Sequence, residues 1–374
     1  MPQRVMVIHS PHSGRSEKLA EAMTHLGHTG VEVVKTISIA DLDHLPAQGT
    51  TWKESSIDVA IAAGGDGLVG GVITHIAESG LPLGILPLGT SNDIARALHI
   101  PQDLQSAAQT IAEGKEQDVD VGVAQPAEQA PHRAPHQSDL LPEQDAPQTY
   151  GYFAHALTVG VNVQFARMAT NVATRQRFGR MTYSVAAVKT WVTHDTLDIQ
   201  LEFEGLAMLS DTANAQGSVS PPPTTPERQT TLRGHALQVA VINTPIFGGQ
   251  RELAIPGSSF ADRLLDIVVI EQMDVGTLGK SIAHLYEPRG HAETPLSPGE
   301  KRTYTYHPAE LSGIPGIHHV QARGVTITTN TDPRDATFDG EVRGHTPIYV
   351  HVAAEQLRVK VPGQEVTSPG EVSH

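Results

Sequence analysis

The sequence predicts an α/β N-terminal domain built on a Rossmann-like parallel sheet, followed by a C-terminal β-rich sandwich domain. The chain has 374 residues, which favours two domains over one. Its first ~120 residues alternate apolar strand-like runs with helix-like runs, a pattern that indicates a parallel sheet covered on both faces. Beyond residue 121 many short strand-like runs are separated by turn residues, which is typical of a sandwich or a barrel.

The first domain alternates short apolar strands with helices. Residues 57–63 are nearly all apolar, as expected for a strand buried on both faces of its sheet. Leu19, Met23 and Leu26 recur at helical spacing and give their segment one apolar side. The expected elements are strands 5–9, 31–39, 57–63 and 83–88, and helices 16–26, 68–77 and one opening at 94–98.

The second domain combines short strands with polar insertions. The first insertion is rich in Pro, Gln, His and acidic residues and lacks apolar periodicity, which predicts a loop. Such insertions are expected near 124–149, 210–228 and 287–301. The expected strands are 154–163, 197–203, 236–243, 264–270, 325–329 and 348–352, with helices at 163–174 and 182–193. We therefore divide the chain into domains 1–121 and 122–355 and a C-terminal segment 356–374, which we expect to pack back on the first domain.

Composition excludes several classes of protein. A formal net charge of −15 argues against a protein that coats nucleic acid, because such binding needs a basic surface. The chain has no cysteine, which rules out disulfides, thiolate metal sites and cysteine nucleophiles. No run approaches the ~18 apolar residues of a membrane span, so we expect a cytoplasmic protein that meets lipid only at a surface.

The first segment that carries chemistry is a glycine-rich loop between an apolar strand and a helix. It contains Gly64, Gly65, Asp66 and Gly67. Glycines let a phosphate approach the backbone, and a helix N-terminus offers unpaired N–H groups. Since Asp66 would repel phosphate directly, the loop predicts a nucleotide held together with a divalent cation. The alternative is a simple tight turn, and a dinucleotide fingerprint ending at Gly70 is weak because no acidic residue ends the next strand.

A second loop repeats the design after the next strand. Gly89 is followed by Thr90, Ser91, Asn92 and Asp93, just before another helix. The polar side chains could contact phosphate oxygens, and Asp93 could position a hydroxyl or act on a metal, although Ser91 or Asn92 alone could equally be a helix cap. Loops that follow successive parallel strands lie at one edge of the sheet, where ligands bind.

A third segment, 337–341, lies far downstream and pairs two acidic residues around a glycine. It contains Asp339 and Glu341. Taken alone it reads as a hairpin turn.

Together these segments resemble the diacylglycerol-kinase catalytic family, which also includes bacterial lipid kinases and the sphingosine and ceramide kinases. The resemblance covers nearly the whole chain and depends on the order and spacing of its motifs. They are Ser10-Pro11-His12-Ser13-Gly14, Gly64-Gly65-Asp66-Gly67, the run from Pro87 to Arg96, Asn243 with Phe247-Gly248-Gly249, the run from Ala261 to Asp266, and Phe338-Asp339-Gly340-Glu341.

The resemblance implies an active site in the cleft between the two domains, ATP and Mg²⁺, and a lipid as acceptor, most simply diacylglycerol. It implies Glu341 as the base on the lipid hydroxyl, with Asp93 and Asp66 also catalytic and Asp66 acting on the metal. Asp262 matches a supporting metal position in some bacterial members. The implied nucleotide-binding residues are Ser10, Gly14, Gly64, Gly65, Asp66, Gly67, Gly89, Thr90 and Asn92, and the implied substrate-cleft residues are Asn243, Phe247 and Asp339.

The chain departs from the family at several positions near the nucleotide. Leu68 stands where diacylglycerol kinases usually have Thr, and Gly70 and Gly71 replace a common Asn-Glu pair. Ser10 replaces an Asn, and Arg263 replaces the glycine that normally follows Asp262. Two further hypotheses stay open beside the lipid kinase. The departures at Leu68, Gly70 and Gly71 support a nucleotide- or lipid-binding regulator without activity, and the Gly-Gly-Asp-Gly loop is shared with NAD kinase-like enzymes.

The expected partner is a lipid substrate at a membrane surface, contacted peripherally. Four arginines gather early in the second domain and could attract anionic lipid by roughly 1 kcal/mol each; an ordinary solvated helix face explains them as well. They are Arg167, Arg175, Arg177 and Arg180. The oligomeric state stays open, a homodimer included.

Overall fold

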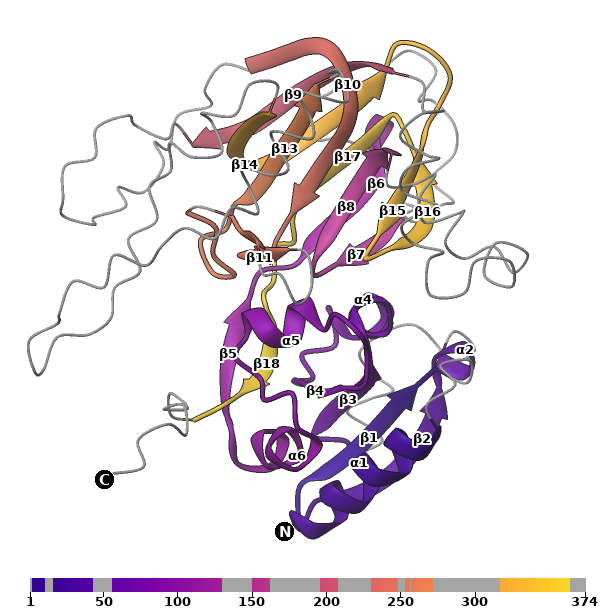
Figure 1. Cartoon of the computed structure of the whole chain (residues 1–374), viewed down its shortest axis with the longest axis vertical. Coiled ribbons are helices and arrows are strands. Elements are labelled where there is room, and N and C mark those ends of the chain that lie inside the picture. The colour runs from indigo at the N-terminus through magenta and orange to yellow at the C-terminus, as the bar shows by residue number, and fades with distance from the viewer. Residues whose placement is uncertain are drawn as a thin grey trace, which may run out of the picture.

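Two sheets divide the protein into two domains, one above the other along the long axis of the molecule (Figure 1). The computed structural model describes residues 2–10, 16–42, 56–129, 150–161, 196–207, 230–247, 253–255, 257–271 and 317–363. Across these ranges no helix has the length and apolar character needed to cross a bilayer.

The N-terminal domain holds a six-stranded sheet in the order β2-β1-β3-β4-β18-β5. The first four of these strands are mutually parallel, β18 joins β4 in parallel, and β5 closes the edge antiparallel to β18. Its strands are β1 (Arg4–His9), β2 (Glu32–Ser38), β3 (Val59–Gly64), β4 (Leu83–Pro87), β5 (Lys115–Val119) and β18 (Leu357–Val361).

Five helices accompany this sheet within the described residues. They are α1 (Ser16–His28), α2 (Ile39–Leu42), α4 (Asp66–Ile76), α5 (Asp93–Ala97) and α6 (Leu104–Glu113). All residues of β3 are buried, as a strand between two helical layers requires. Burial of each aliphatic core side chain stabilises the fold by roughly 1.5–3 kcal/mol, so this central strand anchors the loop that follows it.

The C-terminal domain is one large antiparallel sheet that curves back on itself. Its order is β16-β15-β8-β10-β13-β14-β17-β6-β7, and β9 pairs with both β10 and β14. The strands are β6 (Gly122–Pro126), β7 (Gly151–Phe153), β8 (Ala156–Gly160), β9 (Leu197–Ala207), β10 (Thr230–Ile242), β13 (Leu265–Glu271), β14 (Ile317–Thr329), β15 (Asp335–Phe338), β16 (Glu341–His345) and β17 (Ile348–Val352). A short ribbon of β11 (Ile246–Phe247) and β12 (Leu253–Ala254) lies apart.

The core of this sheet follows from period-2 alternation. In β9, Leu197, Ile199, Leu201 and Phe203 are buried while the residues between them are not. These side chains belong to one cluster with residues from β8, β10, β13, β14, β15 and β17. The expected combination of a parallel-sheet α/β domain with a β-rich domain is confirmed.

Several details of the expected elements were wrong; for example, β10 and β14 begin at 230 and 317, well before the expected 236 and 325. Residues from 124 onward do not start a loop: 124–126 belong to β6, whose backbone pairs with β17, and 127–129 form a 3₁₀ turn. Cross-strand pairing here outweighs the polar composition. Within the expected strand 154–163 only 156–160 form a strand, β8, and residues 154–155 are a break that separates it from β7. α4 begins at Asp66, because an acidic residue in the first turn is favoured by the helix dipole.

Several sequence expectations concern residues outside the described ranges. They are Gly14, the helices 163–174 and 182–193, the four arginines, most of the insertion 124–149, and the insertions 210–228 and 287–301. The C-terminal segment enters the described structure only through residue 363, and its strand β18 lies in the N-terminal sheet beside β4.

Candidate active site between the two domains

Two glycine loops meet at one edge of the N-terminal sheet. They follow the adjacent parallel strands β3 and β4, whose last residues, Gly64 and Pro87, are paired. A Cβ on Gly65 would lie 3.0 Å from the Cα of Gly89, and a Cβ on Gly89 would lie 2.5 Å from the Cα of Gly65. Because any side chain at Gly89 would collide with the opposite backbone, glycine is required for the loops to touch.

Asp66 ties the two loops together. It is the first residue of α4, and its Oδ1 accepts a hydrogen bond of 3.0 Å from the backbone N–H of Ile94 in α5. Ser10 lies just beyond the end of β1, the strand that pairs with β3, and so lies at the same edge. This edge therefore gathers a carboxylate and the N-terminus of an eleven-residue helix, a combination suited to phosphate with a divalent cation.

Asn92 braces the second loop from within. It is buried, has a left-handed backbone, and its Nδ2 lies within 3.1–3.4 Å of three acceptors, Pro87 O, Gly89 O and Gln102 Oε1. Its amide therefore shapes the loop, whereas Thr90 in the same loop is exposed.

Asp93 pairs with a histidine from the other domain. Both side chains are nearly buried, with exposed fractions of 8% for Asp93 and 10% for His155, and His155 Nε2 lies 3.9 Å from Asp93 Oδ2. His155 comes from the break between β7 and β8. Sequence reasoning missed it, because a single histidine beside an apolar strand carries no spacing signal.

The turn between β15 and β16 inserts Asp339 into this junction. Its Oδ1 accepts hydrogen bonds from the N–H groups of His155 (2.9 Å) and Ala156 (3.0 Å), and its Oδ2 accepts one from Ala154 (3.1 Å). Burial raises the pKa of Asp339 above the ordinary carboxyl value, although His155 and these three N–H groups oppose the shift. Asp339 therefore holds the β7–β8 break in place.

Glu341 lies beside the first turn of α4. A Cβ on Gly67 would be 3.5 Å from the carbonyl oxygen of Asp339 and 3.9 Å from Glu341 Oε1. Glu341 is exposed, and its Oε2 accepts a 2.7 Å hydrogen bond from Arg343, whose other terminal nitrogen lies 3.5 Å from Thr74 of α4. The β16 carboxylate therefore faces the glycine loop across the domain boundary.

The same geometry explains one departure from the family pattern. A Cβ on Gly70 would overlap the carboxylate of Asp339, so the helix can approach the β15–β16 turn only with glycine at that position. A Cβ on Gly71 would lie 3.4 Å from Ile39, which is an ordinary contact. Of the two glycines that replace the common Asn-Glu pair, only the first is required by packing.

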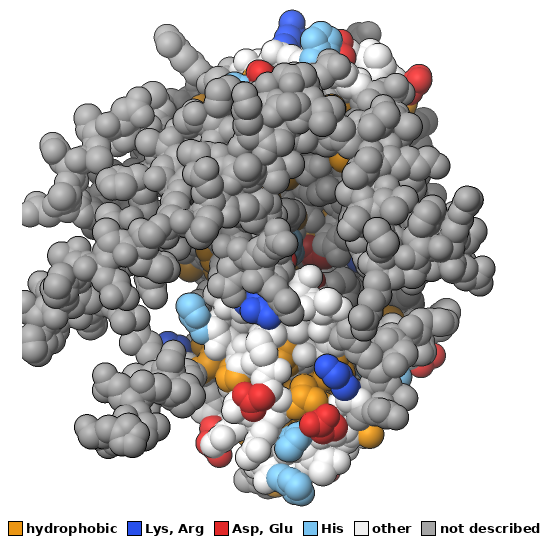
Figure 2. Space-filling view, in the orientation of Figure 1, with side chains coloured by type: hydrophobic (Ala, Val, Ile, Leu, Met, Phe, Trp, Pro, Cys, Tyr) orange, Lys and Arg blue, Asp and Glu red, His pale blue; other side chains and the backbone are white. Residues whose placement is uncertain are grey.

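Asn243 directly follows β10, and Phe247 lies in the next short strand along the chain. Asn243 is buried, and its Nδ2 donates to Asp120 O (2.6 Å) and Ala154 O (3.2 Å), which fastens the β7–β8 break to the segment that enters the second domain. Phe247 lies in β11, which contacts α5. Figure 2 shows acidic side chains in a recess between the two domains.

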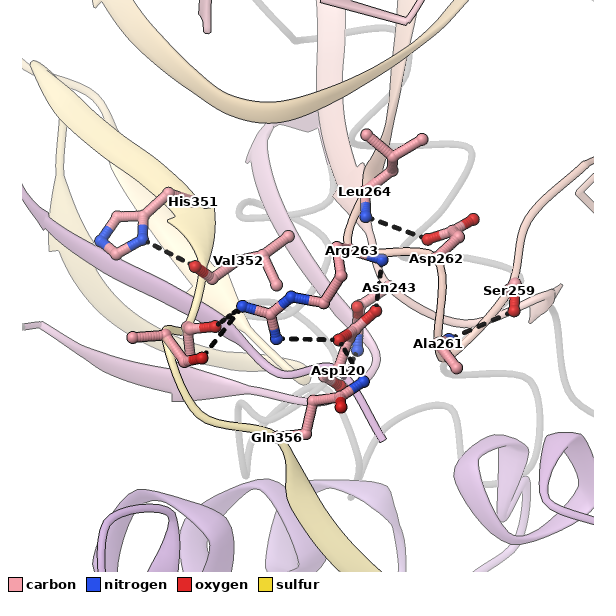
Figure 3. A network of polar contacts seen from close by, with 12 residues as sticks. Asp120, Asn243, Ser259, Ala261, Asp262, Arg263, Leu264, His351, Val352 and Gln356 are labelled. Carbon is pink, nitrogen blue, oxygen red and sulfur yellow. Dashed lines mark hydrogen bonds and ion pairs between the residues drawn. The ribbon is translucent and has the colours of Figure 1, made fainter. Parts of the chain in front are cut away.

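The supporting metal position at Asp262 does not fit a metal. Its Oδ1 accepts a 3.0 Å hydrogen bond from Leu264 N, and burial together with the charges of Asp266 and Asp120 raises its pKa to about 6. The neighbouring Arg263 guanidinium contacts Asp120 instead (Figure 3). No group of three or more His, Asp or Glu among the described residues could hold a metal ion. A nucleotide-bound Mg²⁺ needs only one or two carboxylates, and Asp66 and Asp93 are carboxylates at the same edge, since Asp66 Oδ1 bonds to the N–H of the residue that follows Asp93.

Each of the two domains matches the model of a known protein family. Residues 4–124 match the family model of the diacylglycerol kinase catalytic domain, and residues 155–295 match the YegS C-terminal NAD kinase beta sandwich-like domain. A diacylglycerol kinase from Staphylococcus saprophyticus is 25% identical over 352 residues, covering 93% of this chain and 92% of its own length. One from Staphylococcus aureus is 24% identical, covering 93% and 89%.

Solved structures share the fold. A crystal structure from Bacillus anthracis superposes with a TM-score of 0.61 at 19% identity and covers 96% of this chain and 97% of its own. The two family models and the named relatives confirm the resemblance inferred from the motifs. The chain belongs to the diacylglycerol kinase-like family of lipid kinases.

Proposed function

We propose that this protein transfers the γ-phosphate of ATP, with Mg²⁺, to the hydroxyl of diacylglycerol or a related lipid. The observation that carries the proposal is the approach of Glu341 from the second domain to Gly67 in the phosphate-type loop of the first, at 3.9 Å from a Cβ placed there. The names of the relatives support the acceptor class.

The N-terminal domain would hold the nucleotide. The glycines of the two loops let phosphate oxygens approach the N–H groups that begin α4. Asp66 and Asp93 would hold the Mg²⁺ ion. When bound, that ion neutralises charge that develops on the transferred phosphoryl group.

Glu341 would receive the proton. The acceptor hydroxyl oxygen forms a bond to the γ-phosphorus, the bond from that phosphorus to the β-bridging oxygen breaks, ADP leaves, and the hydroxyl proton passes to the carboxylate. Arg343 donates a hydrogen bond to Oε2 of Glu341 and so orients this side chain, with its other oxygen, Oε1, toward the glycine loop. A general base on one domain and phosphate groups on the other make the reaction depend on the domain junction.

The test is transfer of labelled γ-phosphate from ATP to a panel of lipids in mixed micelles, with Mg²⁺. Asp66→Asn and Glu341→Gln keep the shape of each side chain and should each reduce transfer by at least a hundredfold. Glu271→Gln is the matched control, since that exposed carboxylate pairs with His318 far from the loops. Bound ATP without product on any lipid would refute the proposal and favour the regulator hypothesis.

Contact with a membrane surface is part of the proposal, because a lipid acceptor stays in its bilayer. Vesicle sedimentation with and without anionic lipid tests it. Replacement of Arg167, Arg175, Arg177 and Arg180 by Ala should release the protein from anionic vesicles. Unchanged sedimentation would contradict a role of these arginines in membrane contact.

A further inference from the structure

A buried carboxylate lies where the chain first passes from one domain to the other. Asp120, between β5 and β6, has an exposed fraction of 0%. Its Oδ2 accepts a 2.7 Å hydrogen bond from Arg263 N, and its Oδ1 accepts hydrogen bonds from Arg263 Nη1 (3.1 Å) and Gln356 Nε2 (2.9 Å) (Figure 3). A charge so buried is stable only with such partners.

The same arginine reaches the second passage between the domains. Its Nη2 donates to Ala353 O at 2.6 Å and to Ala354 O at 3.1 Å, in the segment that leads from β17 back to β18. One guanidinium thus joins both passages that the described residues contain, and the loop before β13 supplies it from a third direction.

The backbone conformation at Arg263 indicates that its side chain contributes to stability. Its φ is +62°, in the left-handed region that favours glycine. This chain therefore carries an arginine at a position where its backbone is strained. Such strain persists where surrounding contacts offset it, and Arg263 donates four hydrogen bonds here, one from its backbone N–H and three from its guanidinium.

The oxygen atoms around the guanidinium are those that a hard divalent cation binds. A carboxylate and two backbone carbonyls are typical Mg²⁺ and Ca²⁺ ligands. Here Arg263 nitrogens lie 2.6–3.1 Å from these oxygens, and the planar guanidinium, which stays protonated, supplies the positive charge instead.

We propose that Arg263 is a built-in cation that holds the two interdomain passages together, so that this junction needs no divalent cation. The proposal does not depend on the kinase reaction. It predicts that removal of the guanidinium converts the oxygen cluster into a cation site.

The experiment is thermal unfolding of the full chain in EDTA, in MgCl₂ alone and in CaCl₂ alone. The unsubstituted protein should have nearly the same Tm in all three. Arg263→Gly should unfold several degrees lower in EDTA, although it relieves the backbone strain, and should recover part of the difference in Mg²⁺ or Ca²⁺. Arg358→Ala is the matched control: this arginine pairs with Glu116 inside the first domain, and its loss should bring no cation dependence.

A double variant shows where the ion binds. Asp120→Asn combined with Arg263→Gly should lose the recovery in Mg²⁺ or Ca²⁺. If Arg263→Gly does not fold, Arg263→Lys should fold with an intermediate Tm and faster hydrogen exchange at 119–122 and 353–356, because one ammonium group cannot bridge the carboxylate and both carbonyls. A fall in the Tm of the unsubstituted protein in EDTA, or an Arg263→Gly variant whose Tm matches it or ignores divalent cations, would overturn the proposal.

Discussion

The two domains contact each other at two places, and each place holds a carboxylate with a different set of hydrogen-bond partners. At the candidate active site, Asp339 is held by three backbone N–H groups and pressed against glycines of α4. At the passages between the domains, Asp120 is held by a guanidinium and an amide. The first arrangement uses neutral dipoles and leaves the pKa of Asp339 raised by burial, whereas the second uses a formal charge. The contrast shows that the two carboxylates are stabilised by different partners: backbone N–H groups and close packing at the site, and a charged side chain at the passages.

The largest effect is expected from Asp339→Ala. The change leaves three N–H groups of the β7–β8 break without their acceptor and should lower the free energy of unfolding by roughly 3 kcal/mol. Urea denaturation measures it, with the exposed Asp332→Ala as control. A loss below about 1 kcal/mol would mean that water satisfies these groups and that the turn does not hold the break.

The neighbouring glycines of α4 give a matched pair of variants. Gly70→Ala should lower stability by about 1–3 kcal/mol and impair transfer, because the added methyl group overlaps Asp339. Gly71→Ala has room beside Ile39 and should stabilise the helix by up to ~1 kcal/mol. Equal effects of the two changes would show that packing against Asp339 does not decide the residue at position 70.

His155→Asn tests the pair that joins the domains at the site. Loss of the ring near Asp93 should reduce kcat about tenfold, or about 1.4 kcal/mol of transition-state stabilisation, with the Tm changed little. Steady-state kinetics over pH measures the effect, and His318→Asn, on an exposed strand position, is the control. An unchanged kcat and pH profile would leave His155 as packing only.

The smallest effect concerns pH and Asp262. Its pKa is raised from 3.8 to about 6 in the folded protein, so the folded state binds this proton more tightly than the unfolded state. The resulting stabilisation is full below about pH 4 and is lost as the pH rises through about 6. Asp262→Asn should therefore stabilise the protein by about 1 kcal/mol at pH 7 and remove this pH dependence. If the difference in denaturation midpoint between the two proteins stays constant from pH 4 to 7, Asp262 does not contribute this pH dependence.

Local patterns located most of the first domain and all three acidic motifs. Apolar runs place β1, β3 and β4 because a parallel sheet buries both faces. α6 was not expected, although Asp103 caps it through Ser106 and Ala107, Ala108 and Ile111 form its buried side; those signals were present in the sequence. The strand that continues past residue 124 depends on its partner β17, which lies more than 200 residues away in the chain, and composition could not reveal it.

The sequence by itself determined the class of the two domains and the loops that carry glycine and carboxylate, because strand periodicity and glycine's backbone freedom are local properties. Only the tertiary structure decided which carboxylate does what. The side chains of Asp339, Asn92 and Asn243 bond to backbone groups, and Glu341 faces the loop. Asp120 and His155 carried no signal in the sequence, and the contacts of Arg263 became visible only in the fold. The reason is physical: burial, pKa and hydrogen-bond partners depend on groups from distant segments, and these meet only when the two sheets are joined.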